Sequence, residues 1–344
     1  MANVLDIRRR IRSVRNTRQI TQAMKMISAA RLRRAQDRAL AARPYAQMLT
    51  NVLKSLVSRA EVYDPETGEP KHPLLARRPE NNILLIVVTA DKGLAGAFNA
   101  NILKAAMRFL ENKADKNVDI VAVGRKARDF FRRRFPARDA NAESRSGRVQ
   151  VSDEAPMAAH IDFALANRVA KQIIERYCTE QIDSVYLVYN EFKSVIAQRL
   201  IVDEVLPIAQ IGQHDIREAE EPSKDEMEQR ALAAASAGVS TEPPDTTEID
   251  RAAAQFGTQQ VDYIYEQSPA ELFASVLPKY VAVQIYRALL ESNAAEHAAR
   301  MTAMDSATNN ATEMIDSLTL KMNRVRQASI TKEIIEIVSG AAAL

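Results

Sequence analysis

The sequence has 344 residues, of which 47% are hydrophobic and 26% are charged, and its net charge is +3. This composition is typical of soluble proteins, and the length allows about two domains. The one cysteine, Cys178, excludes an internal disulfide and a multi-cysteine metal site, and the histidines are scattered without metal-ligand spacing. No apolar run reaches the ~20 residues that cross a bilayer. We therefore expect a soluble cytoplasmic protein without a metal or cofactor.

Residues 1–59 predict a long, basic helix. Residues 1–43 carry eleven arginines and one lysine against two aspartates, a net charge of +10, and residues 3–43 lack glycine and proline. A narrow apolar stripe at steps of three and four, with Thr17 filling its one gap, indicates one side of a two-helix seam. The stripe comprises Ile7, Ile11, Val14, Ile20, Met24 and Ile27. Pro44 should kink or interrupt the helix, and the apolar pattern then continues to about Arg59.

Residues 80–211 change to a pattern of strands and helices. The β-branched run Ile83–Val88 indicates a buried strand, and a turn at Asp91–Gly93 leads into an amphipathic segment over 101–111. Further strands are predicted at 118–123, 148–152, 184–190 and 196–206, and further helices at 126–134 and 158–177. Strands that alternate with helices favour a Rossmann-like α/β domain with a largely parallel sheet, and the last strand pair favours an antiparallel edge.

Residues 212–260 differ in composition from the rest of the chain. They hold eleven acidic residues against four basic ones, together with an alanine-rich stretch and two adjacent prolines. We expect a solvated, partly disordered insertion with room for a short helix over 224–237. The alternating residues 261–267 predict a strand that returns to the α/β domain.

Residues 268–344 predict a second long helix, which starts at the capping box Ser268–Glu271 and should kink at Pro278. Steps of four and three then continue without a slip over five heptads, the pattern of a coiled coil. The seam comprises Leu290, Ala294, His297, Met301, Met304, Thr308, Ala311, Ile315, Leu318, Met322 and Val325. His297 is interpreted as a packed seam residue rather than a ligand.

The two long helices must run antiparallel, because one enters the α/β domain with its C-terminal end and the other leaves it with its N-terminal end. Beyond Val325 the seam changes phase, and Ile334, Ile337 and Val338 face a new direction before a small, uncharged tail. We name the residues beyond Val325 the tip and expect it to overhang and to sit in a socket. The predicted fold is a long antiparallel two-helix coiled coil that carries a central α/β domain.

Motifs for catalysis are lacking. The loop Lys92–Ala97 follows a strand and precedes a helix, but it matches neither phosphate-binding glycine pattern, so we interpret it as a structural turn. No Ser/His/Asp set, Cys/His pair or pair of carboxylates emerges, which makes an autonomous enzyme improbable. The basic helix could bind nucleic acid, but its interleaved apolar stripe favours an acidic protein surface.

Several motifs resemble the bacterial F-type ATP synthase gamma subunit family. The most specific is the C-terminal pattern Ile330-Thr331-x-Glu333-x-x-Glu336-x-x-x-Gly340-Ala341-x-Ala343. The same resemblance extends over Ile20–Met26, Arg43–Tyr45, Asp91–Leu94, Ala298–Met301 and Arg326–Ser329. The segment 212–260 is longer than expected for this family, and its role is open.

The resemblance implies a central rotor shaft that couples proton-driven rotation to ATP synthesis by catalytic beta subunits, at the cytoplasmic face of the inner membrane. Its implied partners are three alpha and three beta subunits, the epsilon subunit and the membrane c-ring. The implied rotor–stator contacts are Met24, Lys25, Arg326, Gln327, Thr331, Glu333 and Glu336. Because Ile334, Ile337 and Val338 lie off the seam, we expect them to face the inner wall of the alpha–beta ring as a bearing tip. Tyr263, Tyr265 and Glu266 are assigned to the rotor-ring contact.

The sequence allows two alternatives to the rotor-shaft function. A coiled-coil nucleic-acid-binding adaptor would use the arginines of Arg8–Arg18, and a small nucleotide-binding enzyme would need the phosphate loop that is missing. The sequence leaves open the direction in which the enzyme runs, the coupling ion and the size of the ring.

Overall fold

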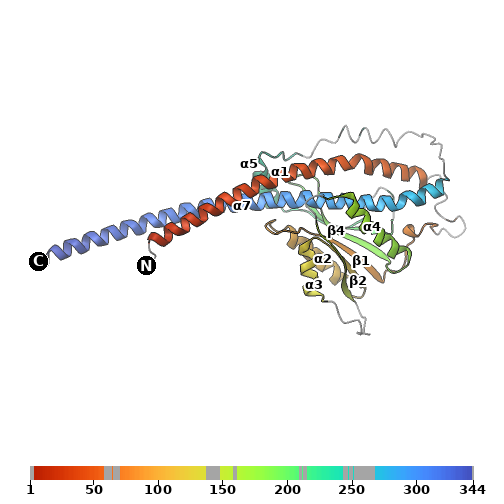
Figure 1. Cartoon of the computed structure of the whole chain (residues 1–344), viewed down its shortest axis with the longest axis horizontal. Coiled ribbons are helices and arrows are strands. Elements are labelled where there is room, and N and C mark those ends of the chain that lie inside the picture. Colours follow the sequence, from red (N-terminus) through yellow and green to blue (C-terminus); the bar gives the residue numbers. More distant parts are fainter. Residues whose placement is uncertain are drawn as a thin grey trace.

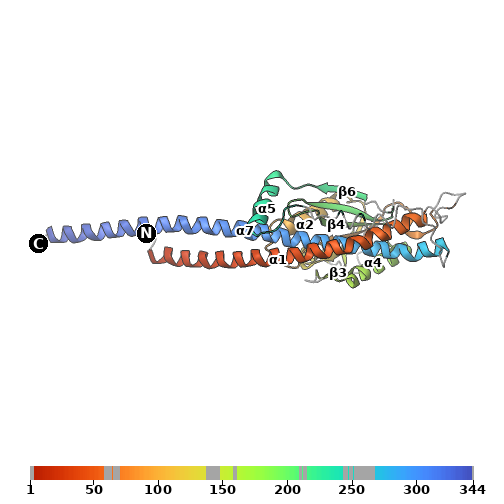
Figure 2. The same ribbon diagram turned by 90° about the horizontal axis from the view of Figure 1, so that it is seen from above.

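Two long helices dominate the computed structural model, which describes residues 4–57, 64, 70–136, 148–157, 161–208, 211, 215–242, 247, 251 and 268–342. Helices α1 (Val4–Val57) and α7 (Pro269–Ala342) lie side by side and antiparallel, and α7 extends well past the start of α1 (Figures 1 and 2). We call this pair the shaft. The predicted antiparallel pair and its overhanging tip are confirmed.

The other described elements form an α/β domain, which we call the foot. Its sheet has the order β3-β2-β1-β4-β5-β6, in which β3, β2, β1 and β4 run parallel and the last two pairings are antiparallel. The strands are β1 (Asn82–Val88), β2 (Asn117–Val123), β3 (Val149–Ala155), β4 (Ser184–Phe192), β5 (Gln198–Leu206) and β6 (Asp215–Glu220). The parallel sheet with an antiparallel edge is confirmed.

Residues Ile83–Val88 of the central strand β1 are all apolar and buried, because both faces of the sheet are covered. Leu84, Ile86 and Val88 of β1 face a core built from α4 (Phe163–Cys178), the end of α1 and the first turns of α7. The alternate residues of β1 face α2 (Phe98–Asn112) and α3 (Arg125–Arg134), together with other residues of α1 and α7. The shaft therefore shares both hydrophobic cores of the foot, and it is rooted in the domain rather than attached to its surface.

Neither proline ends its helix, and the kinks expected at Pro44 and Pro278 stay predictions. Pro44 lies inside α1, which continues to Val57, and Pro278 lies inside α7. A long helix that packs along a core can keep its remaining hydrogen bonds around one proline. The predicted start of α7 is confirmed, because the Ser268 hydroxyl accepts a hydrogen bond from the Glu271 amide at 3.3 Å.

The seam predicted for α7 is confirmed, since all of its members are buried or half-buried. The stripe predicted for α1 is wrong beyond Val14, because Ile20 and Ile27 are 60% and 53% exposed. The buried positions of α1 continue the heptad in steps of four and three through polar side chains. They are Ile7, Ile11, Val14, Arg18, Thr21, Lys25, Ser28, Leu32 and Ala35, of which Val14 and Arg18 are half-buried.

The short helix predicted over 224–237 is confirmed, whereas the described residues 215–220 form a strand that was not predicted. Residues 215–220 form β6 at the edge of the sheet, and α5 (Lys224–Ser236) packs against α7. Alanines compensate for the polar composition, because Ala233 and Ala234 are fully buried and allow close approach. The strand predicted at 261–267 lies outside the described residues.

Candidate functional site

The turn after β1 occupies the place where open α/β sheets bind ligands, beside the point at which the strand order reverses. Internal hydrogen bonds hold this turn. Asp91 Oδ1 accepts from the Arg125 amide at 2.8 Å, and Asn99 Oδ1 accepts from the Ala90 amide at 3.0 Å. Gly124 has φ 94°, and a Cβ atom there would lie 2.0 Å from the Thr89 carbonyl oxygen. The backbone is packed against itself at this point.

Arg300 of α7 lies over the same turn. Its guanidinium donates to the carbonyl oxygen of Gly93 at 3.3 Å and pairs with Glu296 at 2.7 Å. A phosphate cradle presents backbone N–H groups to an anion. Here the loop presents a carbonyl group to a cation that belongs to the shaft, which supports the interpretation of Lys92–Ala97 as a structural turn.

His297 lies half-buried beside this ion pair, with its Nδ1 3.4 Å from Arg300 Nη1. Burial, with added repulsion from Arg300 and Arg31, lowers the pKa of His297 to about 4. Burial also raises the pKa of Glu296. The imidazole is therefore neutral near pH 7, as a packed residue should be.

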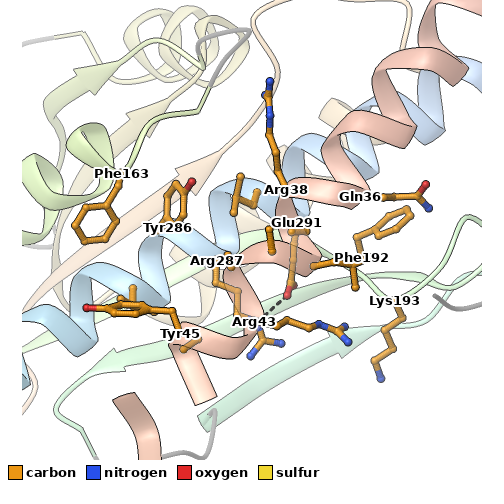
Figure 3. Close-up of a pocket in the computed structure, with 17 residues that line it drawn as sticks. Gln36, Arg38, Arg43, Tyr45, Phe163, Phe192, Lys193, Tyr286, Arg287 and Glu291 are labelled. Carbon is orange, nitrogen blue, oxygen red and sulfur yellow. Dashed lines mark hydrogen bonds and ion pairs between the residues drawn. The ribbon is translucent and has the colours of Figure 1, made fainter. Parts of the chain in front are cut away.

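A hollow of about 500 Å³ lies between α1, α7 and the start of α4 (Figure 3). Phe163 and Tyr286 form much of its wall, in an edge-to-face contact with ring centroids 5.5 Å apart. Glu291, the one carboxylate among its lining residues that the structure describes, accepts from Arg287 at 2.7 Å. A mostly apolar wall with one internal ion pair does not provide groups for acid–base or nucleophilic chemistry.

The structure places Met24 and Lys25 at the point where the shaft leaves the foot. Met24 is half-buried, whereas Lys25 turns inward and forms an ion pair with Asp305 of α7 at 2.9 Å. Its side chain is 11% exposed. This environment argues against a direct contact of Lys25 with another protein.

The other predicted contact residues, Arg326, Gln327, Thr331, Glu333 and Glu336, are all exposed on α7 beyond the start of α1. Two of them take part in exposed local contacts: Ser329 donates to Glu333 at 3.1 Å, and Lys332 lies 3.5 Å from Glu336. The predicted rotor-ring residues Tyr263, Tyr265 and Glu266 lie outside the described residues.

The predicted bearing residues Ile334, Ile337 and Val338 are 55%, 71% and 62% exposed. Ile330 and Ile335 are also exposed, so apolar side chains point to several sides of the tip. The sequence pattern did not indicate Ile335. Exposed apolar surface of this kind marks a binding site. The tip is thus a single helix with exposed charged and apolar side chains that a partner can cover.

The α1 arginines between Arg8 and Arg15 are exposed on the paired part of the shaft next to the tip, where Arg9 lies 3.8 Å from Asp6. None of the helices in the described part of the chain is long and apolar enough to cross a membrane. The candidate functional site is therefore the protruding shaft, and the foot positions it.

A family model described as ATP synthase matches residues 3–344. The ATP synthase gamma chain of Solibacter usitatus is 49% identical over 344 residues, which covers 100% of this chain and 99% of the relative. A gamma chain from Anaeromyxobacter sp. (strain Fw109-5) is 42% identical, with 100% of both chains covered.

Two solved structures share the fold. The first is a chain in a structure of the central stalk and c-ring of the Tetrahymena thermophila mitochondrial ATP synthase. It superposes with a TM-score of 0.51 at 22% sequence identity, and the match covers 84% of this chain and 99% of that chain. The second is a chain of the Euglena gracilis mitochondrial ATP synthase in a structure of OSCP, F1 and c-ring. It has a TM-score of 0.52, 18% identity and coverage of 99% and 94%. Nothing among these similarities supports the nucleic-acid adaptor.

Proposed function

Because the chain belongs to the ATP synthase gamma chain family, we propose that it is the central rotor shaft of an F-type ATP synthase. The protruding pair of helices, with its bare tip, carries this proposal. The chain is a non-catalytic subunit, and ATP is made by the catalytic beta subunits around it. The foot connects the shaft to the c-ring and the epsilon subunit.

The shape of the shaft accounts for the coupling. Three identical beta subunits can adopt different nucleotide affinities at one time only if their common partner shows each of them a different surface. The shaft does so because α7 continues alone past α1, and because the α1 side carries the exposed arginines. Rotation then presents each surface to each beta subunit in turn.

Rotor–stator contacts are proposed for Met24, Arg326, Gln327, Thr331, Glu333 and Glu336, and bearing contacts for Ile334, Ile337 and Val338. Exposure of the tip side chains supports these assignments. Lys25 is withdrawn from the set, because its ammonium group is used inside the chain. Tyr263, Tyr265 and Glu266 of the predicted strand remain proposed for the contact of the foot with the rotor ring.

The chain is a peripheral part of a membrane complex, and its membrane association is indirect, through the c-ring. We assign it to the cytoplasmic face of the inner membrane, with the domain boundaries predicted above. The high positive charge of α1 favours partner surfaces that are acidic.

A rotation assay tests the function. Cys178 is exposed at the end of α4 and is the one cysteine in the sequence, so a thiol-linked probe can be attached to the foot. Reconstituted with alpha and beta subunits, the labelled chain should rotate in one direction during ATP hydrolysis, and Cys178→Ser should abolish labelling but not hydrolysis. Purification of the tagged chain with nucleic acid and without ATPase subunits would favour the adaptor instead.

A further inference from the structure

The segment β6–α5 joins the edge of the sheet to the shaft. Its first part pairs with β5, from Leu200↔Glu220 to Glu204↔Asp215. Helix α5 then begins with a capping box, in which the Ser223 hydroxyl accepts from the Glu226 amide at 3.2 Å, and it lies against α7 where the shaft leaves the foot (Figure 2). The segment thus spans two parts of the molecule that must turn together.

At its C-terminal end α5 completes a polar node with both shaft helices. Lys25 Nζ of α1 lies 2.9 Å from Asp305 Oδ1 of α7 and donates to Ser236 Oγ of α5 at 3.1 Å. Ser236 Oγ lies 3.0 Å from the same Asp305 oxygen. The Lys25 and Asp305 side chains are each 11% exposed, so this ion pair is largely desolvated, and the exposed Ser236 covers it from the side of α5.

Additional contacts hold α5 at its middle and just beyond its C-terminal end. The carbonyl oxygen of Gly238, just beyond α5, accepts from Arg33 of α1. Arg230 donates to the Ile196 carbonyl oxygen beside β5 at 3.1 Å. The buried residues Ala234, Ala237 and Val239 belong to the same core as Leu32 and Ala35 of α1.

We call the stretch of the shaft between Val14 and Ala29 of α1 the neck. The pairing of α1 with α7 needs these contacts of α5 because the seam of the neck is polar. Between Val14 and Ala29 the seam positions of α1 are Arg18, Thr21, Lys25 and Ser28. Apolar packing between α1 and α7 is correspondingly weak over this stretch. A slip of one helix by one turn, about 5.4 Å, would break every contact of the node. The node therefore specifies the register of the two helices.

We propose that β6–α5 is a brace that holds α1 and α7 in register at the neck and ties them to the foot, so that torque passes without slippage. Ser236 and Asp305 are its positioning residues. This inference rests on the proposed shaft function. It gives the acidic segment a mechanical role and places Lys25 inside the rotor.

The first test needs only the full-length chain. Ser236→Ala removes the hydroxyl group and leaves the helix-favouring backbone intact. Ser240→Ala is the control for loss of a serine hydroxyl outside the node, because the Ser240 hydroxyl makes a local contact, accepting from the Glu242 amide at 3.2 Å. Hydrogen exchange of α5 should accelerate by roughly fivefold or more in Ser236→Ala, since a net hydrogen bond is worth about 1 kcal/mol. Exchange of residues 21–28 and 302–309 should accelerate with it, and Ser240→Ala should match the wild type.

The second test uses the reconstituted complex with the beta subunits locked. The angular fluctuation of a probe on Cys178 reports the torsional stiffness of the shaft. Ser236→Ala and the paired change Lys25→Met with Asp305→Leu should widen this fluctuation, while the number of alpha and beta subunits bound stays unchanged. Wild-type fluctuation in both variants, together with unchanged exchange in Ser236→Ala, would overturn the brace. Failure of the wild-type chain itself to assemble with alpha and beta subunits would instead overturn the shaft function.

Discussion

Ile337 offers the sharpest test of the tip as a bearing. Its side chain is 71% exposed and no other part of the described chain covers it. Ile337→Asp should therefore leave the free energy of unfolding of the isolated chain within about 0.5 kcal/mol of the wild type, as for other surface changes. Any larger effect must arise in the complex.

Inside the ring the same substitution should be costly. Full burial of an isoleucine side chain contributes about 1.5–3 kcal/mol, which the variant loses. An aspartate without a fixed partner adds a desolvation cost of several kcal/mol, because a bearing cannot supply a partner at every angle. A combined loss of about 4 kcal/mol corresponds to roughly a thousandfold weaker interaction.

The assay is titration of the chain into alpha–beta complexes, followed by measurement of coupled ATP synthesis. Leu232→Asp is the matched control, because Leu232 is 64% exposed but lies on α5, far from the tip. The control should assemble and couple normally. Shortening the chain at Ser339 should do less harm than Ile337→Asp, because the alanine-rich tail offers little surface. Normal assembly and synthesis with Ile337→Asp would refute a buried tip.

The remaining predictions concern the foot and its junction with the shaft. The pKa of His297 is lowered from 6.5 to about 4. The neutral imidazole should therefore make its full contribution to the free energy of unfolding above pH 6.5, and about 3 kcal/mol of this contribution should be lost as the pH falls to 4. Urea unfolding measured across this range should show the free energy of unfolding falling with pH, and His297→Gln should reduce this pH dependence. Gly124→Ala should lower the free energy of unfolding, measured by thermal denaturation, by about 3–5 kcal/mol, because the new methyl group would clash with the Thr89 carbonyl oxygen. Gly93→Ala should lower it far less, because the nearest atom to its new Cβ would be 4.0 Å away. Calorimetry should detect no ATP binding to the chain alone, because Arg300 caps the turn after β1; micromolar binding would contradict the structural interpretation of that turn.

The parts of the fold that could be predicted are those where burial is continuous. Strands β1 and β4 are apolar because helices cover both faces of the sheet, and the α7 seam repeats without a break because a second helix lies along it. Strand β6 was missed for the opposite reason. Its residues Arg217 to Glu220 are exposed, and its position depends on backbone hydrogen bonds to β5, which leave no apolar pattern.

The α1 seam shows a second limit of prediction from hydrophobicity. The apolar residues Ile20 and Ile27 suggested a stripe, but the heptad passes through Thr21, Lys25 and Ser28. Their polar groups are tolerated because each has a partner: Thr308 donates to Thr21 at 2.8 Å, Lys25 pairs with Asp305, and Ser28 donates to the Met24 carbonyl oxygen at 2.8 Å. Asp305 and Ser236 are far away in sequence, so no local pattern could reveal them.

The three parts of the shaft have different contacts, and each suits a different mechanical task. In the foot, α1 and α7 share apolar cores with the sheet, a form of packing that resists deformation in every direction. At the neck, directional polar contacts specify one register, since a polar seam residue gives up some stability for positional specificity. At the tip, exposed isoleucines offer apolar contact that does not depend on direction. This order suits a rotor. The part in the foot must keep its shape under load, the neck must keep the two helices in register, and the tip must break its contact with each neighbouring subunit as it turns.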